Sequence, residues 1–386
     1  MTFEIQIITD LAVLMVIASA VALLFYRLKQ PLVIGYLIAG ILIGPFTPPF
    51  SLISNIEFLG VFAEMGVILL LFTIGLEFPI GKLRSISHVV LGVSILEISF
   101  MLIVSGILGF VLNWGFYNTL FLGAALASSS TTIIAKVLSD MGKIKEVSSV
   151  IMLGILVVED VAVVIILAML QNVASVNSLI PSSMLFLSVR LILFIGGTLV
   201  VGHLFIPKII DHVAKMNNRE LLYILIFGLC FGFAIIASLI GFSVAIGAFL
   251  IGIVVARSNA REQIKREFVP LQLIFGAIFF VSMGALMDIS KILIYWVPAI
   301  IITLTVLVTK IVCCGVGTRA FGYDKKTSLR IGLGMAQIGE FSFIVIKVGQ
   351  DLGVISDFLL PIIGVVTIIT SFITPYLIRF SFKEIV

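Results

Sequence analysis

The sequence predicts an all-α polytopic membrane protein, and three observations lead to that fold class. Of the 386 residues, 61% are hydrophobic and 11% are charged, and the mean hydropathy is +1.30. Soluble domains carry about 25% charged residues. Apolar runs of about 20 residues, long enough to cross a hydrocarbon core of about 30 Å, recur from Ile7 to Ile378. The three cysteines lie inside such runs, which favours a packing role over a disulfide or metal site.

Polar residues divide the apolar runs into about thirteen predicted transmembrane helices. In chain order they cover residues 7–26, 31–46, 59–78, 88–112, 117–139, 147–170, 183–207, 219–239, 241–256, 269–287, 292–316, 328–349 and 355–379. The second and ninth are the shortest, which favours helices enclosed by protein. Glu4 precedes the first run and Arg27 follows it, the reverse of a secretory signal, so we expect the first helix to be retained.

The positive charges indicate how the helices cross the membrane. Cytoplasmic loops concentrate Lys and Arg. Of the 24 Lys and Arg residues, twenty fall in alternate loops between the predicted spans, and only Lys291 and Lys347 fall in the opposite loops. This pattern favours thirteen spans in a cell membrane, with the N-terminus outside and the C-terminus in the cytoplasm. It also accounts for most of the net charge of +4, so no nucleic-acid partner is expected.

The chain contains two copies of one pattern within a single transporter unit, 1–386. Aligning residue i with residue i + 209 places Gly75 on Gly284 and Gly123 on Gly332, and a three-residue adjustment places 35–41 on 247–253. The first block also aligns Ile80, Lys82 and Leu83 with Ile289, Lys291 and Ile292. The charge pattern directs the third and tenth spans oppositely. We therefore expect inverted-topology repeats, about 7–170 and 219–380, joined by a linker helix at 183–207, an arrangement typical of secondary transporters.

Two adjacent carboxylates, Glu159 and Asp160, lie halfway along the predicted span 147–170, near the midplane of the membrane. A charge at that depth costs about 2.5 to 3.5 kcal/mol on insertion scales, so the pair indicates a functional site. The alternative is a structural buried ion pair with Lys310, which is the only lysine deep in an apolar run.

Small and polar residues interrupt the fifth and twelfth spans at equivalent positions of the repeats. The fifth contains Ser128, Ser129, Ser130, Thr131 and Thr132, and its mate contains Gly332, Gly334, Gln337, Gly339 and Glu340. Such stretches at membrane depth suit interrupted helices that border a water-filled cavity. Ordinary packing of small residues is the alternative. We predict two crossed discontinuous helices, with Ser130, Gln337 and Glu340 at the breaks or along the ion pathway.

Protons and hard cations both bind carboxylate oxygens. Hydroxyl groups of Thr131 or Thr132, together with carbonyl groups at the break, would complete an oxygen shell for a cation at Asp160. If the site switches its access from one side of the membrane to the other only when a proton or a cation is bound, the protein exchanges the two ions. Such exchange needs no ATP, cofactor or enzyme chemistry. Glu64 and Glu97, in the third and fourth spans, lie either in interhelical pairs or beside the cavity.

These motifs resemble those of the monovalent cation:proton antiporter 2 family, which includes NapA-type sodium and Kef-type potassium antiporters. The similarity extends over residues 7–380. The matching stretches, in family order, are 30–35, 69–77, 129–132, 159–160, 241–249, 279–281 and 339–341.

The resemblance implies a NhaA/NapA-like antiporter fold, in which a core of about 59–170 and 269–349 moves against a scaffold formed by the other helices, and a homodimer. It also implies that Asp160 takes up a proton or Na⁺, and that Lys310 pairs with the acidic site when no cation is bound. Glu159 departs from relatives, which commonly have Asp, Asn or Gln there. No cytosolic nucleotide-binding domain of the kind that many Kef-type relatives carry is expected after the last span.

The sequence favours a secondary antiporter that exchanges Na⁺ or Li⁺ for protons. A Kef-type K⁺/H⁺ antiporter is the main alternative, and a gated cation channel is another. A symporter for an organic anion would need positive charge at the centre, and Lys310 alone beside two acids argues against it.

Overall fold

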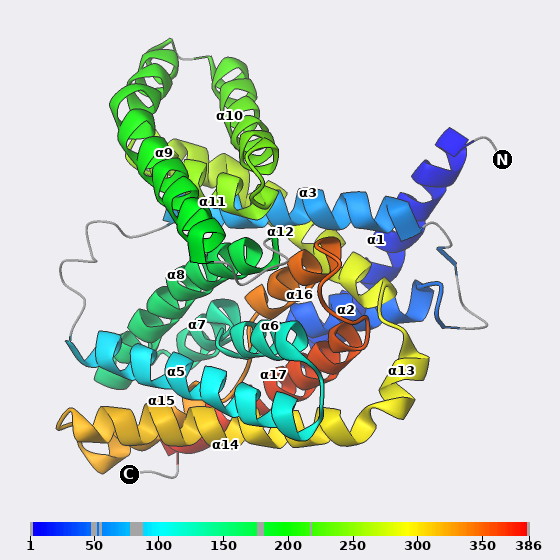
Figure 1. Ribbon diagram of the computed structural model, residues 1–386, viewed down its shortest axis with the longest axis vertical. Coiled ribbons are helices and arrows are strands. Elements are labelled where there is room, and N and C mark those ends of the chain that lie inside the picture. The colour runs from blue at the N-terminus through cyan, green and yellow to red at the C-terminus, as the bar shows by residue number, and fades with distance from the viewer. Residues whose placement is uncertain are drawn as a thin grey trace. The chain divides into compact units, whose positions relative to one another are not determined.

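The computed structural model describes residues 3–47, 52–53, 56–77, 88–175, 181–216 and 218–383, and all regular structure in them is helical (Figure 1). Ile80, Lys82 and Leu83 of the repeat alignment lie outside the described residues. The helices are α1 (Phe3–Arg27), α2 (Leu32–Ile43), α3 (Ile56–Glu77), α5 (His88–Val111), α6 (Phe116–Leu126), α7 (Thr131–Asp140), α8 (Val147–Ser175), α9 (Pro181–Lys215), α10 (Arg219–Leu239), α11 (Val244–Val255), α12 (Arg261–Ala285), α13 (Ile289–Ile294), α14 (Trp296–Ala320), α15 (Lys325–Gly334), α16 (Phe341–Asp351) and α17 (Leu359–Lys383).

The predicted fold class is confirmed, but the count of thirteen crossings is not. Within the described residues, ten segments are long and apolar enough to cross a membrane. The other three predicted spans fall on α2, on α11 and on the interrupted pair α15 and α16. α2 and α11 have 12 residues each, and all residues of α11 except the first are buried. The burial of α11 agrees with the expectation of a helix enclosed by protein, whereas α2 is buried at half of its residues and exposes Leu32 and Leu42.

The chain divides into two compact units. Unit 1 consists of residues 1–7, 55–80 and 168–283, and unit 2 consists of residues 8–54, 81–167 and 284–386. Unit 2 contains every predicted site residue except Glu64, which is exposed on α3 in unit 1. The division into a moving core and a scaffold stays a prediction.

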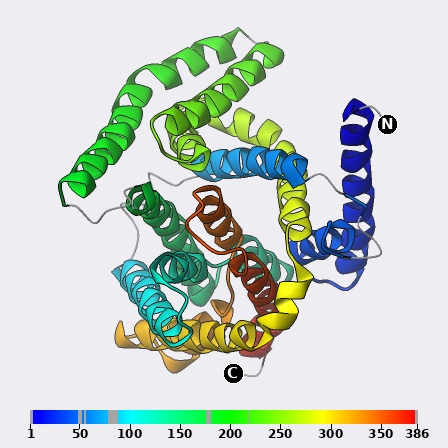
Figure 2. The same ribbon diagram turned by 45° about the vertical axis from the view of Figure 1, so that its right-hand side comes forward.

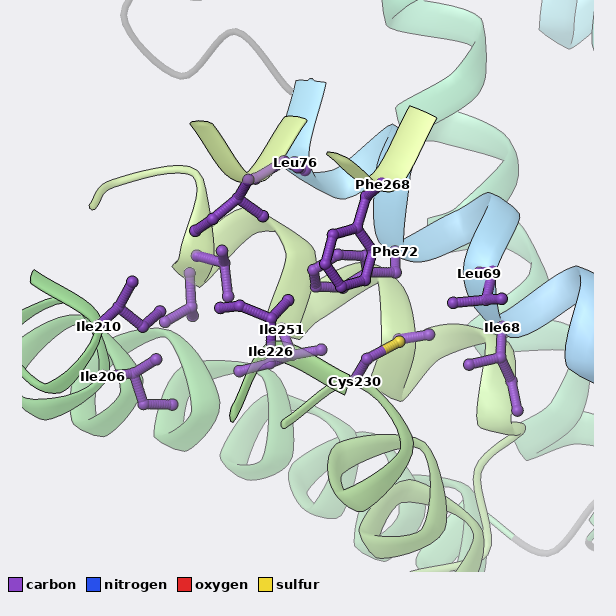
Figure 3. Packing of buried hydrophobic residues seen from close by; sticks show 14 of the residues in the cluster. Ile68, Leu69, Phe72, Leu76, Ile206, Ile210, Ile226, Cys230, Ile251 and Phe268 are labelled. Carbon is purple, nitrogen blue, oxygen red and sulfur yellow. The ribbon is translucent and has the colours of Figure 1, made fainter. Parts of the chain in front are cut away.

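Unit 1 has an aromatic and aliphatic core built by α3, α9, α10, α11 and α12. Figure 3 shows Phe72 and Phe268 packed together in this cluster, with their ring centroids 5.3 Å apart. Cys230 is fully buried among the same side chains. All three cysteines are free and buried, as the packing role predicts.

Glycines at equivalent repeat positions make the closest helix contacts. In unit 1, a Cβ atom on Gly75 of α3 would overlap the carbonyl oxygen of Phe249 in α11. In unit 2, a Cβ atom on Gly284 of α12 would overlap the carbonyl oxygen of Leu37 in α2. The sequence alignment places Gly75 on Gly284 and Leu37 on Phe249, so the same backbone contact occurs once in each unit.

In unit 2, α5 and α14 lie side by side, and the interrupted helices pack beside them (Figures 1 and 2). Gly123 of α6 lies against Leu102 of α5, and Gly332 of α15 lies against Ile311 of α14. The offset of 209 residues relates both members of these pairs. The repeat therefore builds the frame of unit 2 as well.

We predict that Gly75→Ala and Gly284→Ala each lower the free energy of unfolding by about 1 to 3 kcal/mol, because the added methyl group meets backbone that cannot move aside cheaply. Gly60 and Gly276 are matched controls on the same two helices, since a Cβ atom there meets nothing within 4 Å. Alanine at those positions should be neutral or stabilising by up to about 1 kcal/mol. Thermal unfolding of the purified protein in detergent measures all four, and equal unfolding temperatures for Gly75→Ala and Gly60→Ala would contradict the close contact.

Candidate cation-binding site

Two helix breaks in unit 2 frame the candidate site. Residues 127–130 separate α6 from α7, and residues 335–340 separate α15 from α16. Serine side chains compete with a helix for backbone hydrogen bonds, which explains why the apolar helix ends at the run of three serines in the first break. Each break leaves peptide groups without partners in their own helix.

The two breaks supply partners for each other. Gly339 N donates to the carbonyl oxygen of Ser128 at 2.9 Å, and Gln337 Nε2 donates to the carbonyl oxygen of Ser130 at 3.1 Å. A Cβ atom on Gly339 would lie 2.6 Å from the carbonyl group of Ser129, so only glycine allows this approach. The predicted pair of crossed discontinuous helices is confirmed.

Asp160, in the middle of α8, lies beside the first residue of α7. Thr131 Oγ1 donates to Asp160 Oδ2 over a long 3.3 Å. The other carboxylate oxygen, Oδ1, is buried and has no hydrogen-bond partner among the described residues. The first turn of a helix carries free N–H groups and the positive end of the helix dipole. Asp160 therefore combines an unpaired oxygen with a position beside the positive end of a helix dipole.

Glu340 brings a second carboxylate to the crossing. It is the residue that precedes α16, and its Oε1 accepts a hydrogen bond from Thr132 Oγ1 at 3.4 Å. Its charge acts on Asp160. Glu340 thus connects the second break to the start of α7. Its place along an ion pathway stays a prediction.

The crossing is rich in buried oxygen atoms that lack hydrogen-bond partners among the described residues. Besides Asp160 Oδ1, they are Ser130 Oγ, Gln337 Oε1 and Glu340 Oε2. Each unsatisfied buried polar group costs about 1 to 3 kcal/mol. A proton or an alkali cation would satisfy such atoms, since hard cations prefer oxygen ligands. The donor set therefore fits the ions that the sequence predicts.

Lys310 of α14 forms its ion pair with Glu97 of α5, not with Asp160. The distance from Lys310 Nζ to Glu97 Oε1 is 2.8 Å, and both side chains are 0% exposed. Lys310 Nζ also donates to Ser129 Oγ at 2.9 Å. Glu159 is fully buried beside this pair and interacts with Glu97, Lys310 and Ser129. The two neighbouring acids of α8 thus have different partners.

The sequence left Glu97 open between an interhelical pair and a place beside the cavity. The spacing of polar residues on its helix favours the interhelical pair. On α5, the buried polar residues Ser94, Glu97 and Ser105 recur at intervals close to multiples of the helical turn. A buried polar stripe on an apolar helix indicates polar partners on a neighbouring helix. The stripe does not identify Lys310 as the partner.

A second cluster of charged residues, outside the membrane-spanning part of α8, connects the start of this helix to neighbouring segments. Glu146, just before α8, accepts a hydrogen bond from Lys143 Nζ at 2.7 Å and from Arg330 Nη1 at 2.8 Å. Arg330 also donates to the carbonyl oxygen of Ser381, and its guanidinium lies 4.3 Å from the centre of the Phe382 ring. The hydrogen bond from Lys143, together with the charges of Lys143 and Arg330, holds the pKa of Glu146 below its ordinary value.

Comparison with known proteins identifies relatives over almost the whole chain. Residues 12–383 match the family model described as "Sodium/hydrogen exchanger, transmembrane". The Na⁺/H⁺-K⁺ antiporter GerN of Bacillus cereus is 30% identical over 382 residues, which cover 98% of this chain and 97% of GerN. The K⁺/H⁺ antiporter subunit KhtU of Bacillus subtilis is 31% identical, covering 96% and 91%. K⁺ efflux antiporter 4 of Arabidopsis thaliana is 28% identical, and the match spans 97% of this chain but 64% of the plant protein.

A solved structure shares the fold. The sodium proton antiporter MjNhaP1 from Methanocaldococcus jannaschii superimposes with a TM-score of 0.74 over 100% of both chains, at 19% sequence identity. This likeness bears on the fold alone and confirms the predicted antiporter architecture.

We predict a pH-dependent effect of Glu146→Gln on stability. A carboxyl group whose pKa is lower in the folded protein stabilises it at any pH above the unfolded value, about 4.3, and this contribution disappears as the pH falls through the folded value. Wild type should therefore unfold at a higher temperature than Glu146→Gln at pH 7, and the difference should shrink as the pH falls below about 4.3. Thermal unfolding between pH 3.5 and 8 would measure it, and a difference that persists unchanged in acid would contradict the ion pair's role.

Proposed function

Since the chain belongs to the family of transmembrane sodium/hydrogen exchangers, we propose that it exchanges Na⁺ or Li⁺ for protons across a cell membrane by alternating access. The family makes it a cation/proton antiporter and not an enzyme. The observation that carries the proposal is Asp160, held beside Thr131 at the crossing of the broken helices with one carboxylate oxygen unpaired.

The proposed coupling follows from competition for the same oxygens. A proton on Asp160 removes the charge that attracts a cation, and a bound cation excludes the proton. A bare carboxylate inside the membrane is costly, because burying an uncompensated ion costs several kcal/mol. The loaded forms therefore cross more readily than the empty form, and movement of one ion requires return with the other.

The other residues of the crossing complete the proposed oxygen shell. Thr131 and Thr132 present hydroxyl groups, and Glu340 supplies a second carboxylate. Ser130 and Gln337 hold the break and carry unpaired oxygens. Each is proposed to contact the cation or to position a residue that does.

Two further parts of the proposal concern assembly and orientation. By its resemblance to exchangers of this family, the protein is proposed to form a homodimer through its scaffold helices. The bias of Lys and Arg toward alternate loops supports an outside N-terminus and a cytoplasmic C-terminus.

Sodium is favoured over potassium by the number of acids. Asp160, Glu340 and the nearby Glu159 create a strong negative field, and a strong field from few ligands favours the smaller cation. K⁺/H⁺ exchange is the second candidate, because relatives that match nearly the whole chain include the K⁺/H⁺ antiporter subunit KhtU, and GerN is named for both ions.

Asp160→Asn should abolish exchange, since the amide keeps the shape of the side chain but takes up no proton at physiological pH and carries no charge to attract a cation. The measurement uses liposomes with a lumenal pH dye, to which Na⁺, Li⁺ or K⁺ is added with the membrane potential clamped. Asp140→Asn is the control, because Asp140 forms an exposed ion pair with Lys136 at the end of α7. Wild-type proton movement in Asp160→Asn, or cation flux without proton movement, would reject the mechanism.

Thr131→Val should raise the cation concentration that gives half-maximal exchange by about tenfold, because a hydrogen bond to a charged group contributes about 1.5 kcal/mol at the low end and about 1.4 kcal/mol is a factor of ten. Thr131→Ser keeps the hydroxyl group and should stay close to wild type. The same liposome assay compares them over a range of Na⁺ concentrations. Equal KM values for the valine and serine variants would remove Thr131 from the proposed shell.

A further inference from the structure

Lys310 carries a buried positive charge that the exchange cycle proposed above does not use. Its ammonium group lies 2.8 Å from Glu97 Oε1 and donates to Ser129 Oγ at 2.9 Å. Ser129 belongs to the first helix break, two residues before Thr131, the partner of Asp160. The ion pair is therefore attached to the segment that shapes the cation site, although it does not contact Asp160.

Asp160 and Lys310 have different partners among the described residues. Asp160 accepts a hydrogen bond from Thr131 and lies near the acids Glu340 and Glu159, and no ion pair joins it to Lys310 in the part of the chain that the structure describes. Lys310 instead interacts with Glu159 and Glu97. The ammonium group is thus held by acids other than Asp160.

We propose that Glu97 is a positioning residue for cation binding, which holds the Lys310 ammonium against Ser129 and keeps it from competing with the transported cation for Asp160. The inference rests on the proposed role of Asp160 and adds a residue that does not touch the cation. An ammonium group has the charge of Na⁺ and binds the same carboxylate oxygens. Without the Glu97 charge, the remaining acid partner of Lys310 is Glu159, the chain neighbour of Asp160.

Glu97→Gln should raise the KM for Na⁺ on the order of tenfold, because it removes a negative charge and releases a positive one beside the helix break that shapes the cation site, where the effective dielectric is lower than in water. The maximal rate should change little. Glu97→Asp keeps the carboxylate and should keep the KM close to wild type. The readout is Na⁺-dependent proton movement in liposomes over a range of Na⁺ concentrations.

A double variant separates competition from structure. Glu97→Gln with Lys310→Met removes the competing ammonium as well, so its KM should return toward wild type. It replaces both members of the ion pair by uncharged side chains, so Glu159 is the one ionisable group that remains of this trio. Ser129→Ala removes the hydroxyl that holds Lys310 without burying an unpaired charge. It should raise the KM in the wild-type background and have little effect in the double variant.

The outcomes distinguish this inference from the proposed function. A purely structural Glu97 would lower the unfolding temperature and the maximal rate of Glu97→Gln and leave its KM unchanged. That result, or a double variant whose KM is as high as that of the single, overturns the positioning role. Na⁺-dependent thermal stabilisation of the purified protein reports affinity without transport. A wild-type protein that Na⁺ stabilises but that does not exchange rejects the function and still tests Glu97 by binding, and one that responds in neither assay rejects both.

Discussion

The site depends on a constraint that a membrane imposes on the polypeptide backbone. Peptide groups freed by a helix break at membrane depth must find partners within the protein. Here the two breaks bond to each other through Ser128, Gln337 and Gly339, and the close approach requires a glycine at 339. These bonds hold the start of α7 beside α8, where Thr131 reaches Asp160. The arrangement that satisfies the backbone therefore also creates a buried, oxygen-rich site.

The two repeats share their helix packing but not the charged residues of the site. The repeat supplies the same glycine contacts in both halves, as Gly75 and Gly284 show. The charged side chains of the site have no charged counterparts at the equivalent positions of the other repeat. The offset of 209 residues places Ile369 opposite Asp160 and Met101 opposite Lys310. Duplicated packing thus explains how the broken helices come to cross, and single substitutions within one copy explain why ions bind at one place on that frame.

The sequence was sufficient for the frame and insufficient for the pairing of charges. Helices could be predicted because apolar runs of membrane length are unambiguous, and the breaks because serines and glycines interrupt them. Hydropathy placed the tenth span at 269–287, whereas α12 begins at Arg261, because a helix continues into water without needing apolar residues. The pairing of Lys310 with Glu97 depends on the rotation and height of α14 against α5, which periodicity does not contain. The repeat offset aligns Glu97 with Val306, and Lys310 lies one helical turn beyond Val306. This alignment is consistent with the pair but does not identify a contact.

The positive ends of helices stabilise a buried carboxylate too weakly to replace a bound proton or cation. α7 and α16 both begin at the crossing, so the positive ends of two helix dipoles lie near Asp160 and Glu340. Each such end stabilises a nearby negative charge by about 0.3 to 1 kcal/mol, and by up to about 2 kcal/mol when partly buried. Leaving a carboxylate charged and uncompensated in a protein interior costs several kcal/mol, and two carboxylates repel each other as well. The dipoles therefore reduce the cost of an empty site without removing it. The cost that remains favours binding of either a proton or a cation. Competition between these two ions couples their movements in the proposed exchange.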